Sequence, residues 1–177
     1  ATVAEAARLI DAYDFSGLAD LVYHAIFDDF CDWYLELLKA GAADGANDAL
    51  QLAVLERRYQ RRLAEALMRE GVRFADPSRI DIRGTVSAGM DVEVDVDVVF
   101  EGRVVLHDGV RIGPFCRLKD VELGAGTVVH AHCDFDGAVI GDGCTLGPYA
   151  RLRPGTVLAE SAHIGNFVET KQAKLGQ

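Results

Sequence analysis

The chain has few of the features that mark membrane, secreted or zinc-binding proteins. No apolar run reaches the roughly eighteen residues needed to cross a bilayer, and the first residues lack the basic and apolar regions of a signal peptide. We therefore expect a cytoplasmic protein without a membrane partner. The four cysteines form no CxxC pair, and three of them recur at regular spacing, which favours small buried residues over metal ligands or disulfides. These three are Cys116, Cys133 and Cys144.

Basic residues are also scarce, with 18 Lys and Arg against 28 Asp and Glu. Residues 1–44 alone hold nine acidic and two basic residues. A protein that binds nucleic acid needs basic surface to neutralise phosphate. We therefore expect no nucleic-acid partner.

Two stretches carry apolar residues at helical spacing, on either side of a break at residues 40–48. The first, within residues 2–39, has Ser16 as a candidate N-cap, and the second is expected from Ala49 to about Glu70, with Asn47 or Asp48 as its cap and Gly71 at its end. Arginines on the second helix form either a solvated face, paired with acidic residues, or a phosphate-binding patch. The apolar residues that form a stripe along the first stretch are Val22, Ile26, Phe30, Trp33 and Leu37. The corresponding stripe of the second helix is Leu52, Leu55, Tyr59, Leu63 and Ala66. The arginines of the second helix are Arg57, Arg58, Arg61 and Arg62.

After Pro77 the period changes to six residues, which is typical of a parallel β-helix built from hexapeptide repeats. The step shortens by one residue at 118–123 and near 135–140, where we expect tight turns. At about 18 residues per coil, the repeat predicts four to five coils. One apolar residue of each hexapeptide is expected to point into the β-helix, and we call these residues anchors. They are Val94, Phe100, Leu106, Ile112, Leu118, Leu123, Val129, Ile140, Leu146, Leu152, Leu158 and Ile164. Small or β-branched residues two positions earlier are expected at the corners: Val110, Cys116, Val121, Thr127, Cys133, Ala138, Cys144, Ala150, Thr156 and Ala162.

Three segments in one order resemble a single enzyme family: "LQLAVLERRYQ", "GVRFADPSRIDIRGTV" and "GPYARLRPGTVLAESAHIGNFVETKQAKLG". The family is the bacterial bifunctional enzyme with UDP-N-acetylglucosamine pyrophosphorylase and glucosamine-1-phosphate acetyltransferase activities. The resemblance covers about residues 45–177. It implies a linker helix, the first half of a left-handed β-helix, and assembly as a homotrimer with acetyltransferase sites between subunits.

Residues 1–44 resemble a different family. "YDFSGLADLVYHAIFDDFCDWYLELLK" is similar to the helical anticodon-binding domain of valyl-tRNA synthetases. The chain is therefore expected to be a chimera of α+β class. Its segments are expected to be helical at 1–44, a linker helix and lead-in at 45–76, and a β-helix at 77–177 that ends before the family's later coils.

The family resemblance implies two substrate-binding residues. Arg153 in "RLRPG" and Lys171 in "VETKQ" match the family positions that bind the sugar phosphate. A guanidinium fork and an ammonium group both suit phosphate oxygens. The alternative is that both residues are ordinary solvated cations on the outside of the β-helix.

No catalytic residue and no metal site are predicted. The family's His general base and its acetyl-CoA-binding coils are expected to lie beyond the residues present, so no cofactor is expected. Asn47 matches a metal-ligating position of the pyrophosphorylase, but a lone ligand does not make a magnesium site. Surface or stacking roles are expected for His107, His130, His132 and His163, and "HAH" places His130 and His132 on one strand face, where a weak metal site is conceivable.

These observations favour a self-associating β-helix scaffold without complete catalytic machinery. Two alternatives remain open. One is a residual glucosamine-1-phosphate acetyltransferase, and the other is a weak sugar-phosphate-binding module.

Overall fold

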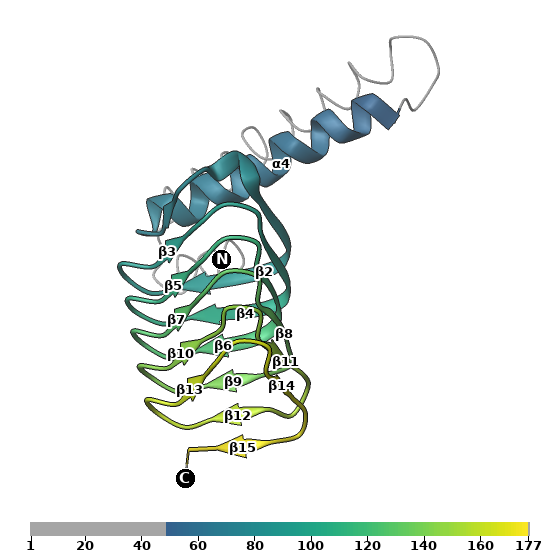
Figure 1. Cartoon of the computed structure of the whole chain (residues 1–177). Helices are drawn as coiled ribbons and strands as arrows, with labels where there is room; N and C mark the ends of the chain where they lie inside the picture. Colours follow the sequence, from purple (N-terminus) through teal and green to yellow (C-terminus); the bar gives the residue numbers. More distant parts are fainter. Residues whose placement is uncertain (1–48, 177) are drawn as a thin grey trace, which may run out of the picture. The chain divides into compact units, whose positions relative to one another are not determined.

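The computed structural model describes residues 49–176. It contains the helix α4 (Ala49–Arg69), a short 3-10 helix η2 (Pro77–Arg79), and a stack of short parallel strands. Figure 1 shows the strands of successive turns lying above one another. The helices expected within residues 2–39, and the caps proposed at Asn47 and Asp48, lie outside the described residues.

The strands form a parallel β-helix of three faces and about six turns. Face one is a six-stranded sheet, whereas faces two and three belong to one nine-stranded sheet that bends where its longest strands pass the corner. Face one comprises β1 (Arg73–Phe74), β3 (Glu93–Val94), β5 (Arg111–Ile112), β7 (Val128–Val129), β10 (Thr145–Leu146) and β13 (His163–Ile164). The strands β2 (Ile80–Ala88), β4 (Val98–Leu106) and β6 (Arg117–Leu123) run along faces two and three. Face two continues with β8 (Asp134–Asp136), β11 (Arg151–Leu152) and β14 (Glu169–Thr170), and face three with β9 (Val139–Ile140), β12 (Val157–Leu158) and β15 (Lys174–Leu175).

The expected α+β class with a parallel β-helix is confirmed, but the predicted number of four to five turns is too low. The difference arises at the start, because the predicted anchors begin only at Val94 and residues 73–88 are not counted among them. In the structure β1 pairs with β3, and β2 pairs with β4 along its whole length. This segment therefore forms a complete first turn.

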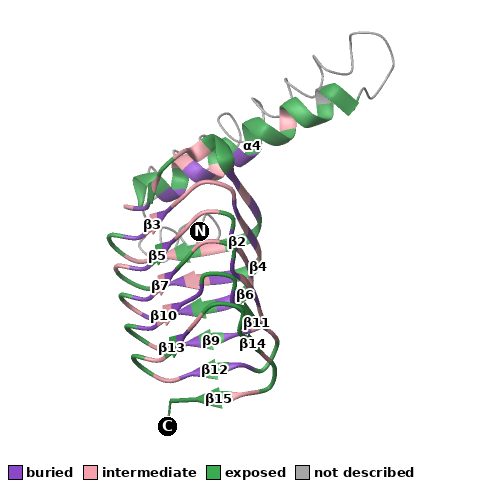
Figure 2. Cartoon of the chain, viewed as in Figure 1, coloured by how far each residue is buried: buried purple, intermediate pink, exposed green. Residues whose placement is uncertain are grey.

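The predicted anchors are all buried, each with at most 6 % of its surface exposed. Buried positions recur along successive turns of the solenoid as far as β13, whereas β14 and β15 hold none (Figure 2). Phe135 was not among the predicted anchors, yet it is fully buried and fills the position between Val129 and Ile140. The predicted tight turns also occur, because Asp120 and Gly137 take positive φ angles of 50° and 59° where the step shortens.

The C-terminal part of α4 covers the start of the solenoid, with a face that includes Leu63 of the predicted stripe but not Tyr59 or Ala66. Residues 55–69 of α4 belong to the same compact unit as the solenoid. Their buried side chains are Gln60, Ala64 and Leu67, whereas Tyr59, expected in the apolar stripe, is 49 % exposed. The helix ends as expected at Gly71, whose φ is +108°, a conformation that glycine adopts without strain.

The buried face of α4 includes one polar residue, Gln60, because its side-chain amide forms hydrogen bonds with the backbone of β2. Its Oε1 accepts a hydrogen bond from the Ile82 N–H at 2.6 Å, and its Nε2 donates to the Ile82 carbonyl at 3.1 Å. Ile82 lies in β2, whose only strand partner among the described residues is β4. The side-chain amide thus takes the place of a neighbouring strand at the open edge of the first turn, where unpaired backbone would otherwise be exposed.

Among the described residues, no helix has both the length and the apolar character needed to cross a membrane.

We expect Gln60→Leu to destabilise the fold. The leucine keeps most of the volume but leaves the Ile82 N–H and carbonyl without partners, at a cost of about 1–3 kcal/mol. Urea unfolding followed by circular dichroism measures the change. Tyr59→Leu, at the exposed neighbouring position, is the matched control and should change stability by less than about 0.5 kcal/mol. Equal stabilities of the two variants would contradict this role of Gln60.

Candidate functional site

Arg153 and Lys171 lie on the outside of face two, in consecutive turns. The strands β11 and β14 pair in register, with Leu152 beside Thr170. The Arg153 N–H continues this ladder by donating to the Thr170 carbonyl at 3.0 Å. Adjacent strands lie about 4.8 Å apart, so the backbones at positions 153 and 171 are direct neighbours.

The two cations differ in their surroundings. Arg153 Nη1 donates to Glu169 Oε1 at 3.0 Å, and the Arg153 side chain is 40 % exposed. Lys171 is exposed and forms no ion pair with any residue that the structure describes. The site therefore offers one free ammonium group beside a guanidinium that already shares a carboxylate.

Glu169 belongs to a row of alternating charges that runs along face two. In register across successive turns, the row reads Arg117, Asp134, Arg151 and Glu169. Arg117 contacts Asp134 at 2.9 Å, Arg151 contacts Asp134 at 3.5 Å, and Arg151 contacts Glu169 at 3.8 Å. Because the pairing strands are in register, each side chain lies beside one of opposite sign.

The first turns continue this charge pairing. Arg117 also donates to Glu101 at 2.7 Å, and this hydrogen bond lowers the pKa of the Glu101 carboxyl. Partial burial raises the pKa of Asp81, but hydrogen bonds and charge from Arg57 and Arg83 outweigh it, so the pKa is lowered overall. Most cations on face two are thus neutralised within the protein, which distinguishes Lys171 from them.

The four expected surface histidines lie away from face two. His107 Nε2 lies 3.0 Å from Glu122 Oε1, and His130 and His163 are exposed residues of face one. His132 sits at the corner with a φ of 61°, so it does not share a strand face with His130 as expected. The rotation of the backbone at the corner separates the two imidazoles. No group of three or more potential metal ligands occurs among residues 49–176.

His132 instead belongs to a column of stacked rings at the corner between faces one and two. The rings of Phe115, His132, Tyr149 and Phe167 stack with centroid separations of 4.9, 4.8 and 5.3 Å. All four residues have positive φ angles and exposed side chains. The surface or stacking role expected for His132 is confirmed, but the column as a whole was not predicted, although its members recur every 17 or 18 residues.

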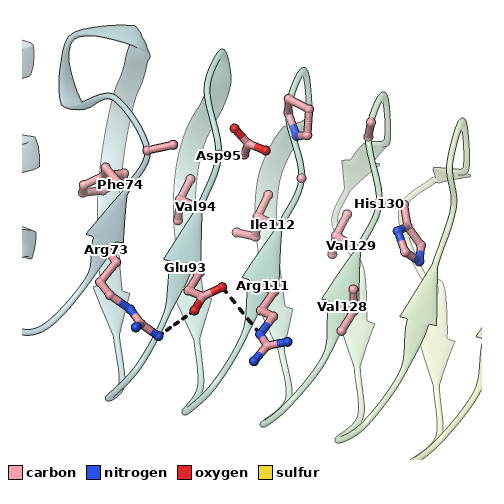
Figure 3. Close-up of a pocket in the computed structure, with 14 residues that line it drawn as sticks. Arg73, Phe74, Glu93, Val94, Asp95, Arg111, Ile112, Val128, Val129 and His130 are labelled. Atoms are coloured by element: carbon pink, nitrogen blue, oxygen red, sulfur yellow. Dashed lines mark hydrogen bonds and ion pairs between the residues drawn. The ribbon is translucent and has the colours of Figure 1, made fainter.

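A shallow groove of about 630 Å³ crosses the outside of face one. One wall is an ion-paired row in which Glu93 contacts Arg73 at 2.6 Å and Arg111 at 3.6 Å (Figure 3). Asp95 and His130 stand on the opposite side. Arg153 and Lys171 do not line this groove, so the groove and the predicted site are separate.

The expectation for the three repeat cysteines is confirmed, since Cys116, Cys133 and Cys144 are buried free thiols. Cys116 and Cys144 donate to the carbonyls of His130 and Ala159 at 3.2 and 3.1 Å. Burial raises the pKa of the Cys144 thiol, so it remains protonated. All three thiols are buried at the tight corners of the solenoid.

The repeated turns, buried anchors and parallel register define a β-helix of the hexapeptide-repeat class. The model of the family described as the GMPPB C-terminal domain matches residues 82–175, more than half of the chain, and the chain belongs to this family. The bifunctional protein GlmU of Stenotrophomonas maltophilia (strain K279a) is 61% identical over 137 residues, covering 77% of this chain and 30% of that protein. The homology to GlmU expected for the β-helix region is confirmed.

GlmU of Stutzerimonas stutzeri (strain A1501) is 51% identical over 159 residues, 90% of this chain and 35% of that protein. Because residues 45–177 number only 133, this match extends into residues 1–44. The chain spans about a third of the length of these two relatives. Among solved structures, serine acetyltransferase isoform 3 of Entamoeba histolytica is 18% identical, with a TM-score of 0.32, over 82% of this chain and 60% of that chain.

A second family model, the anticodon-binding domain of tRNA ligase, matches residues 1–69. This match agrees with the kind of domain that residues 1–44 resemble. It also includes α4, which precedes the first turn of the solenoid. The valyl-tRNA synthetase assignment and the chimeric origin remain predictions.

Proposed function

We propose that the chain is a self-associating β-helix scaffold that binds a sugar phosphate at Arg153 and Lys171 and does not complete acetyl transfer by itself. The observation that carries the proposal is the placement of these two cations in consecutive turns of face two, with Lys171 free of ion pairs among the described residues. The homology to GlmU supports glucosamine-1-phosphate as the ligand, and acetyl-CoA as the acetyl donor of the family's reaction.

The surroundings of Arg153 predict weak binding. A phosphate can accept hydrogen bonds from two guanidinium nitrogens at once, which is the favoured geometry for this pair. Glu169 already accepts one of these hydrogen bonds and repels an incoming anion. The phosphate therefore has to share Arg153 with Glu169, and we expect Lys171 to contribute most of the attraction.

The proposed lack of turnover rests on the chemistry that acetyl transfer requires. Acetyl transfer to an amine needs a base that accepts the amine proton and donors that stabilise the oxyanion. Within residues 49–176, no imidazole lies on face two beside Arg153 and Lys171. We therefore expect the chain to hold the sugar phosphate without acetylating it.

Titration of the ¹⁵N-labelled chain with glucosamine-1-phosphate tests the binding site. The amide signals of Arg153, Glu169 and Lys171 should shift, and Lys171→Ala should weaken binding about tenfold, or about 1.4 kcal/mol. Lys119→Ala is the matched control, because Lys119 lies on the same face but is paired with Asp136 at 3.5 Å. The proposed site would be ruled out if the amide signals of Arg153 and Lys171 did not shift. It would also be ruled out if Lys171→Ala and Lys119→Ala lost the same affinity for glucosamine-1-phosphate.

Face three is the best candidate for contact between subunits in a trimer. Its outward row reads Val105, Glu122, Val139, Val157 and Lys174, so two neighbouring valines lie between the charged residues; Val139 is 48 % and Val157 39 % exposed. The neighbouring Gly141 and Ala159 have small or no side chains, which allows a flat surface to approach closely. Face two, in contrast, is covered by charged side chains.

Sedimentation velocity tests this assembly. The wild-type chain should sediment as a trimer, and Val157→Asp should shift it towards monomer, because the new carboxylate would be buried without a partner. Thr145→Asp places the same charge on face one and should leave the trimer intact. A wild-type chain that sediments as a monomer would overturn the proposal.

We further propose that the chain joins pieces of two families and that residues 1–44 serve as a packing element, not as a tRNA-binding module. Their nine acidic and two basic residues support this, since phosphate binding requires the opposite charge. The GlmU match that extends into this region weighs against a sharp junction at residue 44.

A gel-shift assay with total tRNA tests the proposed role of residues 1–44. No retarded band should form at about 50 mM salt, where electrostatic binding is strong. A band that appears at this salt concentration and disappears at about 200 mM would support tRNA binding instead.

A further inference from the structure

We draw no further inference here: the strongest candidate, the exposed ring column of Phe115, His132, Tyr149 and Phe167 at the corner between faces one and two, is an unpartnered apolar surface, and nothing in the structure shows what covers it.

Discussion

The in-register pairing of each turn with the next is the constraint on which the other features depend. From β2 onward, a residue lies directly beside the one 17 or 18 positions later, at the same position of the same face. Apolar anchors therefore stack on one another inside, opposite charges alternate along face two, and aromatic rings stack at one corner. The same pairing leaves an open strand edge at the first turn, which the amide of Gln60 satisfies.

The solenoid was predictable because its signal is repeated many times. Anchors such as Leu118 and Leu152 recur at a six-residue step, and a single exception does not hide the period. Burial of the corner cysteines followed from the same argument, since a tight corner accepts only a small side chain. The positions of Arg153 and Lys171 also follow from the repeat, because residues 18 apart on an outer face become neighbours.

Features that depend on contacts between distant residues were missed or misjudged. Gln60 was not singled out, because helical periodicity counts apolar residues and ignores an amide that pairs with a strand edge. Tyr59 was assigned to the buried stripe for the same reason. Phe135 is missing from the predicted anchors although it lies six residues after Val129, immediately before the shortened step at Gly137. The pairing of Arg153 with Glu169 depends on the conformations of both side chains as well as on the register between turns, and the repeat predicts only the register.

We propose that Arg153 and Lys171 of the β-helix hold a sugar phosphate and that the chain does not acetylate it by itself. An acetyl-transfer assay on the purified chain tests this claim most directly, by following the release of free thiol from acetyl-CoA in the presence of glucosamine-1-phosphate. We predict no release above background, with the wild-type chain and Arg153→Ala giving the same trace. Turnover by the wild-type chain that disappears in Arg153→Ala would contradict the claim and establish a residual acetyltransferase.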